Sequence, residues 1–168
     1  MRRHYPCLLL FVLTAGLQAA VIEGAASAKG LSKTALPALE SILGRATPAI
    51  RSVRLELRSG RQESFSIRKT SDAVVVTGAD STGLGYGMQE LTAQLAAAGA
   101  ARDVTRSPEV EIRSVALFLY NRDLEQEWFY SEDFWNGYFS LLARARFNRI
   151  SLIFGHQTSY FAPLFPFL

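Results

Sequence analysis

The sequence predicts an α/β fold, and three observations support that prediction. Apolar residues recur at helical spacing in three segments. The segments between them alternate apolar and polar residues or run as short β-branched stretches, which is typical of strands. With 49% hydrophobic and 20% charged residues, the chain has the composition of a globular protein rather than a disordered one.

Residues 1–28 are predicted to be a secretory signal peptide. A basic start precedes the apolar stretch 7–17, and residues 26–28 have the A-x-A form that a signal peptidase accepts. Cleavage after Ala19 or Ala20 fits the pattern as well. The apolar stretch is shorter than the roughly 20 residues that a membrane span needs. We therefore expect a secreted or periplasmic protein that is free of the membrane once the leader is removed.

Charge and composition exclude several classes of function. The net charge of +3 comes from scattered residues and is too small to predict nucleic-acid binding. The single cysteine, Cys7, and one of the two histidines, His4, lie in the leader. The mature chain therefore lacks the cysteines for a disulfide framework and the side chains for a histidine–cysteine metal site. We expect neither a metal nor another cofactor.

Two helices are predicted in the first part of the mature chain. Residues 32–45 place leucine and isoleucine side chains on one face, and Gly44 suits the end of a helix. Residues 81–98 repeat this helical spacing and stop at Gly99.

Three strands are predicted between these helices. Residues 53–58 and 64–68 alternate apolar and polar side chains around a turn, so we expect them to form a hairpin. Residues 72–78 contain a continuous β-branched run, which predicts a central strand covered on both faces.

The polar stretch 100–108 contains a proline and predicts a linker with a domain boundary. On this basis residues 29–107 form an accessory α/β domain, and residues 108–168 begin a second domain that is incomplete.

The second domain follows a strand–helix–strand pattern. We expect a strand over 111–119, a polar loop to about residue 130, a helix over 131–147 and a strand over 148–154. Strands joined in this way should be parallel neighbours. One helix cannot cover both faces of such a pair, so we expect further chain, or another chain, to complete the sheet. The predicted buried stripe of the helix comprises Phe134, Tyr138, Leu141, Leu142 and Ala145.

Three stretches carry a family resemblance. Residues 65–78 include F-S-I and V-V-V-T-G, and residues 83–91 read G-L-G-Y-G-M-Q-E-L. Pro108 precedes Ile112-Arg113 at the start of the next strand, and residues 141–152 read L-L-A-R-A-R-F-N-R-I-S-L. In this order the stretches resemble the N-terminal part of family-20 glycoside hydrolases (β-hexosaminidases) and of α-glucuronidases.

The resemblance implies an accessory domain like domain 2 of β-hexosaminidases, followed by the first turns of a TIM barrel, (β/α)8. It implies a carbohydrate substrate and hydrolysis of O-glycosyl bonds in poly- or oligosaccharides. The family's acidic catalytic pair follows the fourth barrel strand, so the catalytic residues would lie outside this chain. The family's usual aspartate and Arg-His after the first strand are absent, and residues 119–125 read L-Y-N-R-D-L-E, which predicts a divergent relative.

Five residues are candidates for substrate binding. Tyr120, Asn121 and Arg122 follow the first barrel strand and offer groups that hydrogen-bond vicinal hydroxyls. His156 follows the second strand, where a substrate hydroxyl or a structural partner could engage it. Arg113 matches an arginine that reaches sugar hydroxyls in family 20, and the alternative is a salt bridge at the domain junction.

Other motifs give weaker predictions. The acidic residues of 123–127 lie in one loop, where nothing fixes the separation of an acid–base pair. Trp128 and Phe129 suit sugar stacking or packing. The glycines of 83–87 lack the spacing of a phosphate-binding loop, which favours tight packing instead.

Two functions therefore remain open at this point. The first is the N-terminal fragment of an exported glycoside hydrolase. The second is a non-catalytic carbohydrate-binding or assembly module. The pattern leaves the sugar, the linkage and the oligomeric state undetermined.

Overall fold

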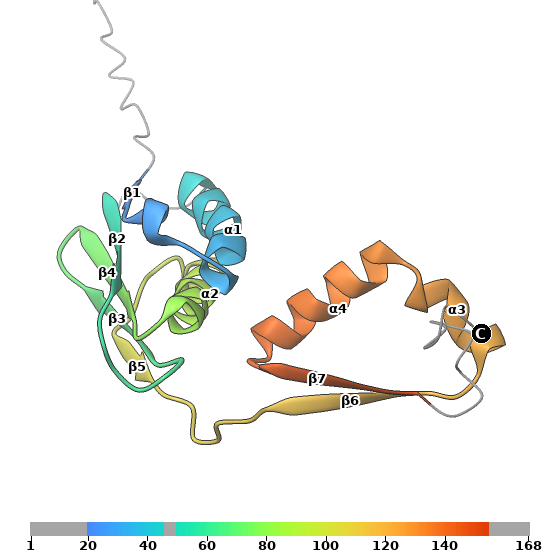
Figure 1. Ribbon diagram of the computed structural model, residues 1–168. Helices are drawn as coiled ribbons and strands as arrows, with labels where there is room; N and C mark the ends of the chain where they lie inside the picture. The colour runs from blue at the N-terminus through green and yellow to red at the C-terminus, as the bar shows by residue number, and fades with distance from the viewer. Residues whose placement is uncertain (1–19, 46–49, 155–168) are drawn as a thin grey trace, which may run out of the picture.

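The computed structural model describes residues 20–45 and 50–154 (Figure 1). These residues form two units, a five-stranded mixed sheet with two helices and a two-stranded sheet with two helices. The mixed content confirms the predicted α/β class. Within the described residues, no helix combines the length and the apolar character that crossing a membrane would require.

The larger sheet has the strand order β1-β2-β4-β3-β5. Strands β1, β2 and β4 run parallel to one another, whereas β3 is antiparallel to both β4 and β5. The strands are β1 Val21–Glu23, β2 Ser52–Leu57, β3 Phe65–Lys69, β4 Ala73–Gly78 and β5 Val104–Arg106.

The expected hairpin between residues 53–58 and 64–68 is wrong, because β4 lies between the two strands. The observed hairpin joins β3 to β4, and the Thr70 amide donates to the Ala73 carbonyl at 2.9 Å in its turn. Val74 and Val76 of β4 are fully buried. Placing this apolar strand between two neighbouring strands and under a layer of helices buries most of its apolar surface. For this reason β4 lies at the centre of the sheet.

Two further details differ from the sequence prediction. The supposed linker 100–108 contains β5, which pairs with β3 and completes the sheet. The alternate side chains of β4, including Val75, are half-buried rather than buried, so only one face of this strand is fully covered. A linker with few apolar residues can still supply an edge strand, because its backbone groups pair whatever the side chains are.

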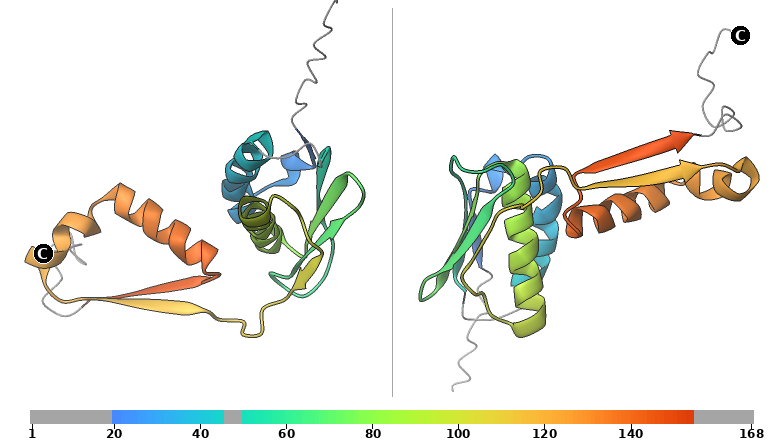
Figure 2. Two further views of the ribbon diagram at one scale, coloured as in Figure 1. Left: turned by 180° about the vertical axis from the view of Figure 1, so that it is seen from behind. Right: turned by 90° about the horizontal axis from the view of Figure 1, so that it is seen from below.

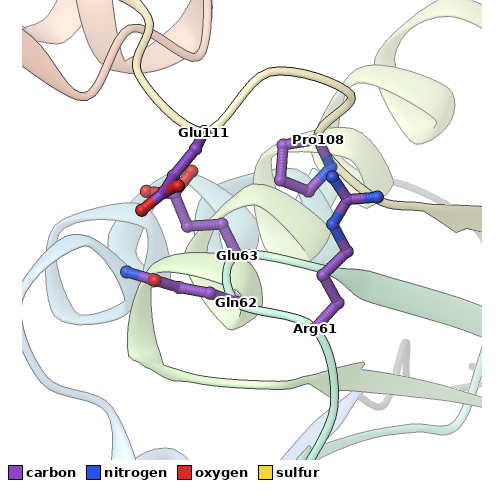
Figure 3. A pocket seen from close by; sticks show the side chains of 5 residues that line it. All are labelled: Arg61, Gln62, Glu63, Pro108 and Glu111. Carbon is purple, nitrogen blue, oxygen red and sulfur yellow. The ribbon is translucent and has the colours of Figure 1, made fainter.

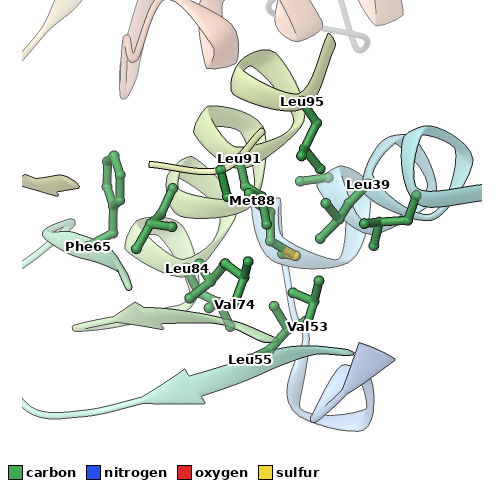
Figure 4. Close-up of a cluster of buried hydrophobic side chains, with 14 of the residues drawn as sticks. Leu39, Val53, Leu55, Phe65, Val74, Leu84, Met88, Leu91 and Leu95 are labelled. Carbon is green, nitrogen blue, oxygen red and sulfur yellow. The ribbon is translucent and has the colours of Figure 1, made fainter. Parts of the chain in front are cut away.

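Both helices of this unit cover the same face of the sheet (Figures 1 and 2). Helix α1 spans Leu31–Arg45 and α2 spans Ser81–Ala98, as the periodicity predicted. Asp80 caps α2 by accepting from the Gly83 amide, and Gly99 ends it in the left-handed conformation. Their apolar faces meet the sheet in one core (Figure 4), which includes Leu39, Val53, Leu55, Phe65, Ile67, Val74, Leu84, Met88, Leu91 and Leu95.

The second unit contains the predicted parallel strand pair. β6 spans Ser114–Leu119 and β7 spans Arg149–Phe154, and they pair in parallel over their whole length. The expected loop before residue 130 is wrong, because it contains helix α3, Arg122–Phe129. Asn121 caps α3 by accepting from the Asp123 amide, a local signal that lets so short a helix form.

Helix α4, Glu132–Arg144, is capped by Ser131 as expected, but its predicted buried stripe is not buried. No side chain of α4 is fully buried, and Leu141 is exposed. Two strands offer a helix too little surface to cover it. Large apolar side chains are therefore exposed on this unit, among them Phe118, Phe139, Leu141, Leu152, Ile153 and Phe154.

We predict that Gly78→Ala strongly destabilises the first unit. A Cβ at Gly78 would lie 2.3 Å from the Leu84 backbone nitrogen, at the end of the central strand. Relieving that clash must shift β4 away from α2, at a cost of about 3 kcal/mol in the free energy of unfolding. Urea denaturation measures this cost.

Gly44→Ala is the matched control, because a Cβ there has no neighbour within 4 Å. This exposed helical position should gain roughly 0.5–1 kcal/mol from the substitution. Equal effects at Gly78 and Gly44 would contradict the close approach of β4 and α2.

Candidate functional site

The two ends of the β6–β7 pair have different surroundings. Arg113 and Asn148 directly precede the two strands and contact the first unit. Tyr120 and Asn121 follow β6 at the opposite end. A strand of six residues spans about 20 Å, so these two sets of side chains cannot share one small ligand.

The end that faces the first unit is held by a partly buried ion pair. The Arg113 guanidinium binds the carboxylate of Glu63, which lies in the turn between β2 and β3. The Arg113 side chain is 20% exposed and that of Glu63 is 10% exposed. This is the junction salt bridge that the sequence left as the alternative role for Arg113.

Backbone carbonyls accept from two further nitrogens of Arg113. Its Nε donates to the Arg146 carbonyl at 2.6 Å, and one terminal nitrogen donates to the Val110 carbonyl at 2.7 Å. Burial alone lowers the pKa of Arg113, but the hydrogen bonds to Glu63 and Tyr86 outweigh it, so the pKa is raised above its ordinary value. The guanidinium therefore stays charged, and its hydrogen bonds hold it at the junction between the two units.

Asn148 connects the same carboxylate to the second strand. Its Nδ2 donates to Glu63 at 3.0 Å and to the Glu111 carbonyl at 2.8 Å, and its Oδ1 accepts from the Arg113 amide at 2.9 Å. One glutamate of the first unit thus fixes the starts of both β6 and β7.

A second ion pair lies beside the first. The Arg146 guanidinium binds Glu90 of α2 at 2.9 Å. It also lies over the Phe65 ring, 5.1 Å from the centroid, and over the Tyr86 ring at 5.9 Å. These contacts join the loop before β7 to the helix and sheet of the first unit.

Glu63 and Arg146 are the two non-glycine residues with positive φ in the part of the chain that the structure describes, at 60° and 63°. This conformation is unfavourable for residues with a Cβ. Asp80 offsets the cost at Glu63, because its carboxylate accepts from the Glu63 amide at 2.8 Å while it caps α2. Both strained residues belong to the junction, which indicates that the contacts there determine the local backbone.

A shallow pocket of about 230 Å³ adjoins this network (Figure 3). Its walls are the β2–β3 turn, through Arg61 and Glu63, and the segment that enters β6, through Pro108 and Glu111. A larger groove of about 490 Å³ runs between α1, α2 and the end of α4. Neither cavity brings together two unpaired carboxylates that could act as an acid–base pair, because Glu63 and Glu90 both form ion pairs with arginines.

The other end of the strand pair carries the exposed candidates. The Tyr120 ring is exposed and stacks on Phe118, with 5.8 Å between the centroids. The side chain of Asn121 caps α3. The Glu125 carboxylate accepts from the Tyr120 and Asn121 amides, which gives this acidic residue a structural role.

Two of the remaining candidate residues, Arg122 and His156, cannot be placed in full. The structure does not describe the Arg122 side chain, and His156 lies outside the described residues. Trp128 packs against Phe134 and Trp135, with centroids 4.8 and 5.9 Å away, so it belongs to an aromatic cluster formed by α3 and α4. Within residues 20–45 and 50–154, no group of three or more acidic, histidine or cysteine residues is arranged to hold a metal ion.

The glycines of 83–87 fit the packing interpretation. A Cβ at Gly83 would lie 2.3 Å from the Ser64 carbonyl oxygen, and one at Gly85 would meet Leu31 and Ser32 of α1. These glycines therefore let α2 approach both the β2–β3 turn and α1.

Sequence reasoning missed Glu63 and Asp80. Asp80 stands directly before the predicted helix, so it could have been identified as a cap from the sequence. Glu63 carries no such signal, because its partner Arg113 lies 50 residues away.

This combination of a five-stranded α/β unit with a parallel βαβ unit gives the chain a glycoside-hydrolase-like fold, and solved structures show the likeness. A GH138 enzyme targeting pectin rhamnogalacturonan II matches with a TM-score of 0.66 and 24% identity over 82% of this chain. A family-20 β-N-acetylglucosaminidase matches with a TM-score of 0.55 and 26% identity over 83% of this chain. The chain spans 19% and 26% of these two proteins. No protein-family model and no curated protein matches the sequence.

We predict that Glu63→Ala costs about 2 kcal/mol in the free energy of unfolding, because it leaves the partly buried Arg113 without a counter-charge. Denaturation of Glu63→Ala, Arg113→Ala and the double variant measures the coupling between the two side chains. The double variant should lose less stability than the two single losses added together.

The Arg54–Glu23 pair is the matched control, because both of its side chains are exposed. Arg54→Ala should change stability little. If the double variant loses as much stability as the two single variants together, Glu63 and Arg113 are not coupled.

Tyr86 gives a prediction of pH dependence. Burial raises its pKa, since the phenolate is disfavoured away from water, and the hydrogen bond to Arg113 opposes the shift only partly. The unfolded chain therefore releases this proton first, near pH 10. The stabilisation is complete below that pH and is lost as the pH rises towards the folded pKa.

Melting temperatures recorded between pH 8 and pH 11 check this prediction. The parent protein should lose stability above about pH 10 more steeply than Tyr86→Phe, which has no phenolic proton. Parallel curves would contradict it.

Proposed function

We propose that this chain is part of an exported glycoside hydrolase that acts on O-glycosyl bonds of poly- or oligosaccharides. The main support is the β6–α4–β7 unit, which has the strand–helix–strand order of a barrel repeat and is fixed to an accessory unit. The two similar structures, both of glycoside hydrolases, add to this support. The finer assignment to family 20 rests on the sequence motifs of residues 65–152.

The substrate side of the unit is proposed to be the carboxyl end of β6 and β7. In (β/α)8 barrels the loops after the strands build the active face, whereas the opposite face serves stability. Tyr120 and Asn121 lie at that end of β6, and Arg122 and His156 follow the two strands in sequence. Arg113 belongs to the opposite face, where its partners are Glu63 and backbone carbonyls.

The catalytic carboxylates are proposed to lie outside this chain. On α3, Glu125 is bound to two backbone amides, which leaves it unsuited to proton transfer with a sugar. An acid–base pair in a glycosidase also needs two carboxyl groups that face each other across the scissile bond. The acidic residues that directly follow β6, Asp123, Glu125 and Glu127, all lie on the single short helix α3.

The test is hydrolysis of a panel of glycosides by the protein translated from the complete natural reading frame. We expect cleavage of at least one glycosidic linkage. Saturable glycan binding without hydrolysis would instead support the second candidate, a non-catalytic carbohydrate-binding module. Absence of both hydrolysis and binding would overturn the proposal.

We predict that Tyr120→Ala raises KM for the cleaved glycoside by roughly 3- to 10-fold, because an exposed ring at the substrate end can stack on a sugar face. Ile112→Ala is the matched control, since this side chain is similarly exposed at the other end of β6. Steady-state kinetics of both variants check the prediction. An equal change in the two variants would remove Tyr120 from the substrate site.

A further inference from the structure

Strand β1 lies inside the segment that the sequence pattern assigns to the leader. Val21, Ile22 and Glu23 pair in parallel with Ser52–Arg54 of β2, and the Val21 amide donates to the Arg51 carbonyl at 3.0 Å. β1 is thereby the edge strand of the five-stranded sheet next to β2 (Figure 1).

The side chains of this strand also belong to the folded unit. Ala20 and Ile22 pack against the core. The Glu23 carboxylate accepts from the Arg54 guanidinium at 2.9 Å, and this hydrogen bond raises the pKa of Arg54. Both an apolar and an ionic contact therefore attach β1 to the rest of the sheet.

The connection from β1 to α1 is equally specific. Gly24 has φ 83°, and a Cβ there would lie 2.3 Å from the Leu55 carbonyl oxygen, so the chain passes directly against β2. A short 3-10 turn follows at Ala25–Ser27, and the Lys29 carbonyl accepts from the hydroxyls of Ser32 and Ser81. A chain that was only a leader would need neither the close approach nor these bonds.

We propose that export processing cuts the chain ahead of Val21, after Ala19 or Ala20, so that β1 remains in the mature protein. The proposal rests on the export proposed above. The enzyme would be an endopeptidase that recognises small residues before the cleaved bond. It hydrolyses one amide C–N bond with one water, leaving a carboxylate on the leader and a new α-amino group on the mature chain.

The alternative cut after Ala28 is disfavoured by the fold. It would remove all of β1, and with it the Glu23–Arg54 pair and the cover that Ile22 gives the core. The unpaired backbone groups of β2 would then form the edge of the sheet. Because Ala20 itself packs against the core, the bond between Ala19 and Ala20 fits the structure best.

The experiment is N-terminal sequencing and intact-mass measurement of the exported protein, made from its complete reading frame in an export-competent host. We expect a new N-terminus at Ala20 or Val21. An N-terminus at Lys29, or a chain that keeps Met1, would overturn the proposal. Neither readout depends on glycosidase activity, so failure here is distinguishable from failure of the proposed function.

Two sets of variants sharpen the assignment. Ala26→Leu with Ala28→Leu should leave the N-terminus unchanged, whereas Ala19→Leu with Ala20→Leu should make the precursor accumulate. A protein that starts at Lys29 should melt roughly 5 °C or more below one that starts at Ala20, because it lacks the edge strand. Equal melting temperatures, or a shift of the N-terminus by the first pair of substitutions, would contradict the proposal.

Discussion

The ion pair between Glu63 and Arg113 is the contact on which the arrangement of the two units depends. It is partly buried and is shared with Asn148, so a single carboxylate fixes the starts of both strands of the second unit. Glu63 adopts a left-handed backbone to reach that position, and Asp80 supports it from the start of α2. Removing either partner of such a pair destabilises the protein, because the remaining charge is left partly buried without a counter-charge.

This contact lies at the opposite end of the β6–β7 pair from the proposed substrate side. The residues at the beginnings of the strands make the contacts of the junction, whereas Tyr120 at the end of β6 is exposed. Since barrel enzymes place chemistry at the carboxyl ends of their strands, the division observed here matches the division between a supporting face and an active face.

Periodicity was sufficient to predict the elements that depend on local spacing. Helix α2 and the parallel pairing of β6 with β7 agree with it, because one apolar stripe or one crossover determines each. Strand order was not predictable in the same way. It followed from burial of Val74 and Val76, which put β4 between β2 and β3, two strands that follow each other in the sequence. The junction was partly predicted at Arg113, but its partner Glu63 is a distant turn residue with no pattern around it.

The second unit leaves large apolar side chains exposed. A parallel strand pair is stable when both faces are covered, and α4 provides only partial cover. Phe118 and Phe154 at the ends of β6 and β7 remain exposed, as does Leu141 on α4. Burying such side chains stabilises a protein by about 25 cal/mol for each Å² of apolar surface. Cover of these side chains by further strand–helix repeats in the same parallel register is what the sequence analysis predicts for this sheet.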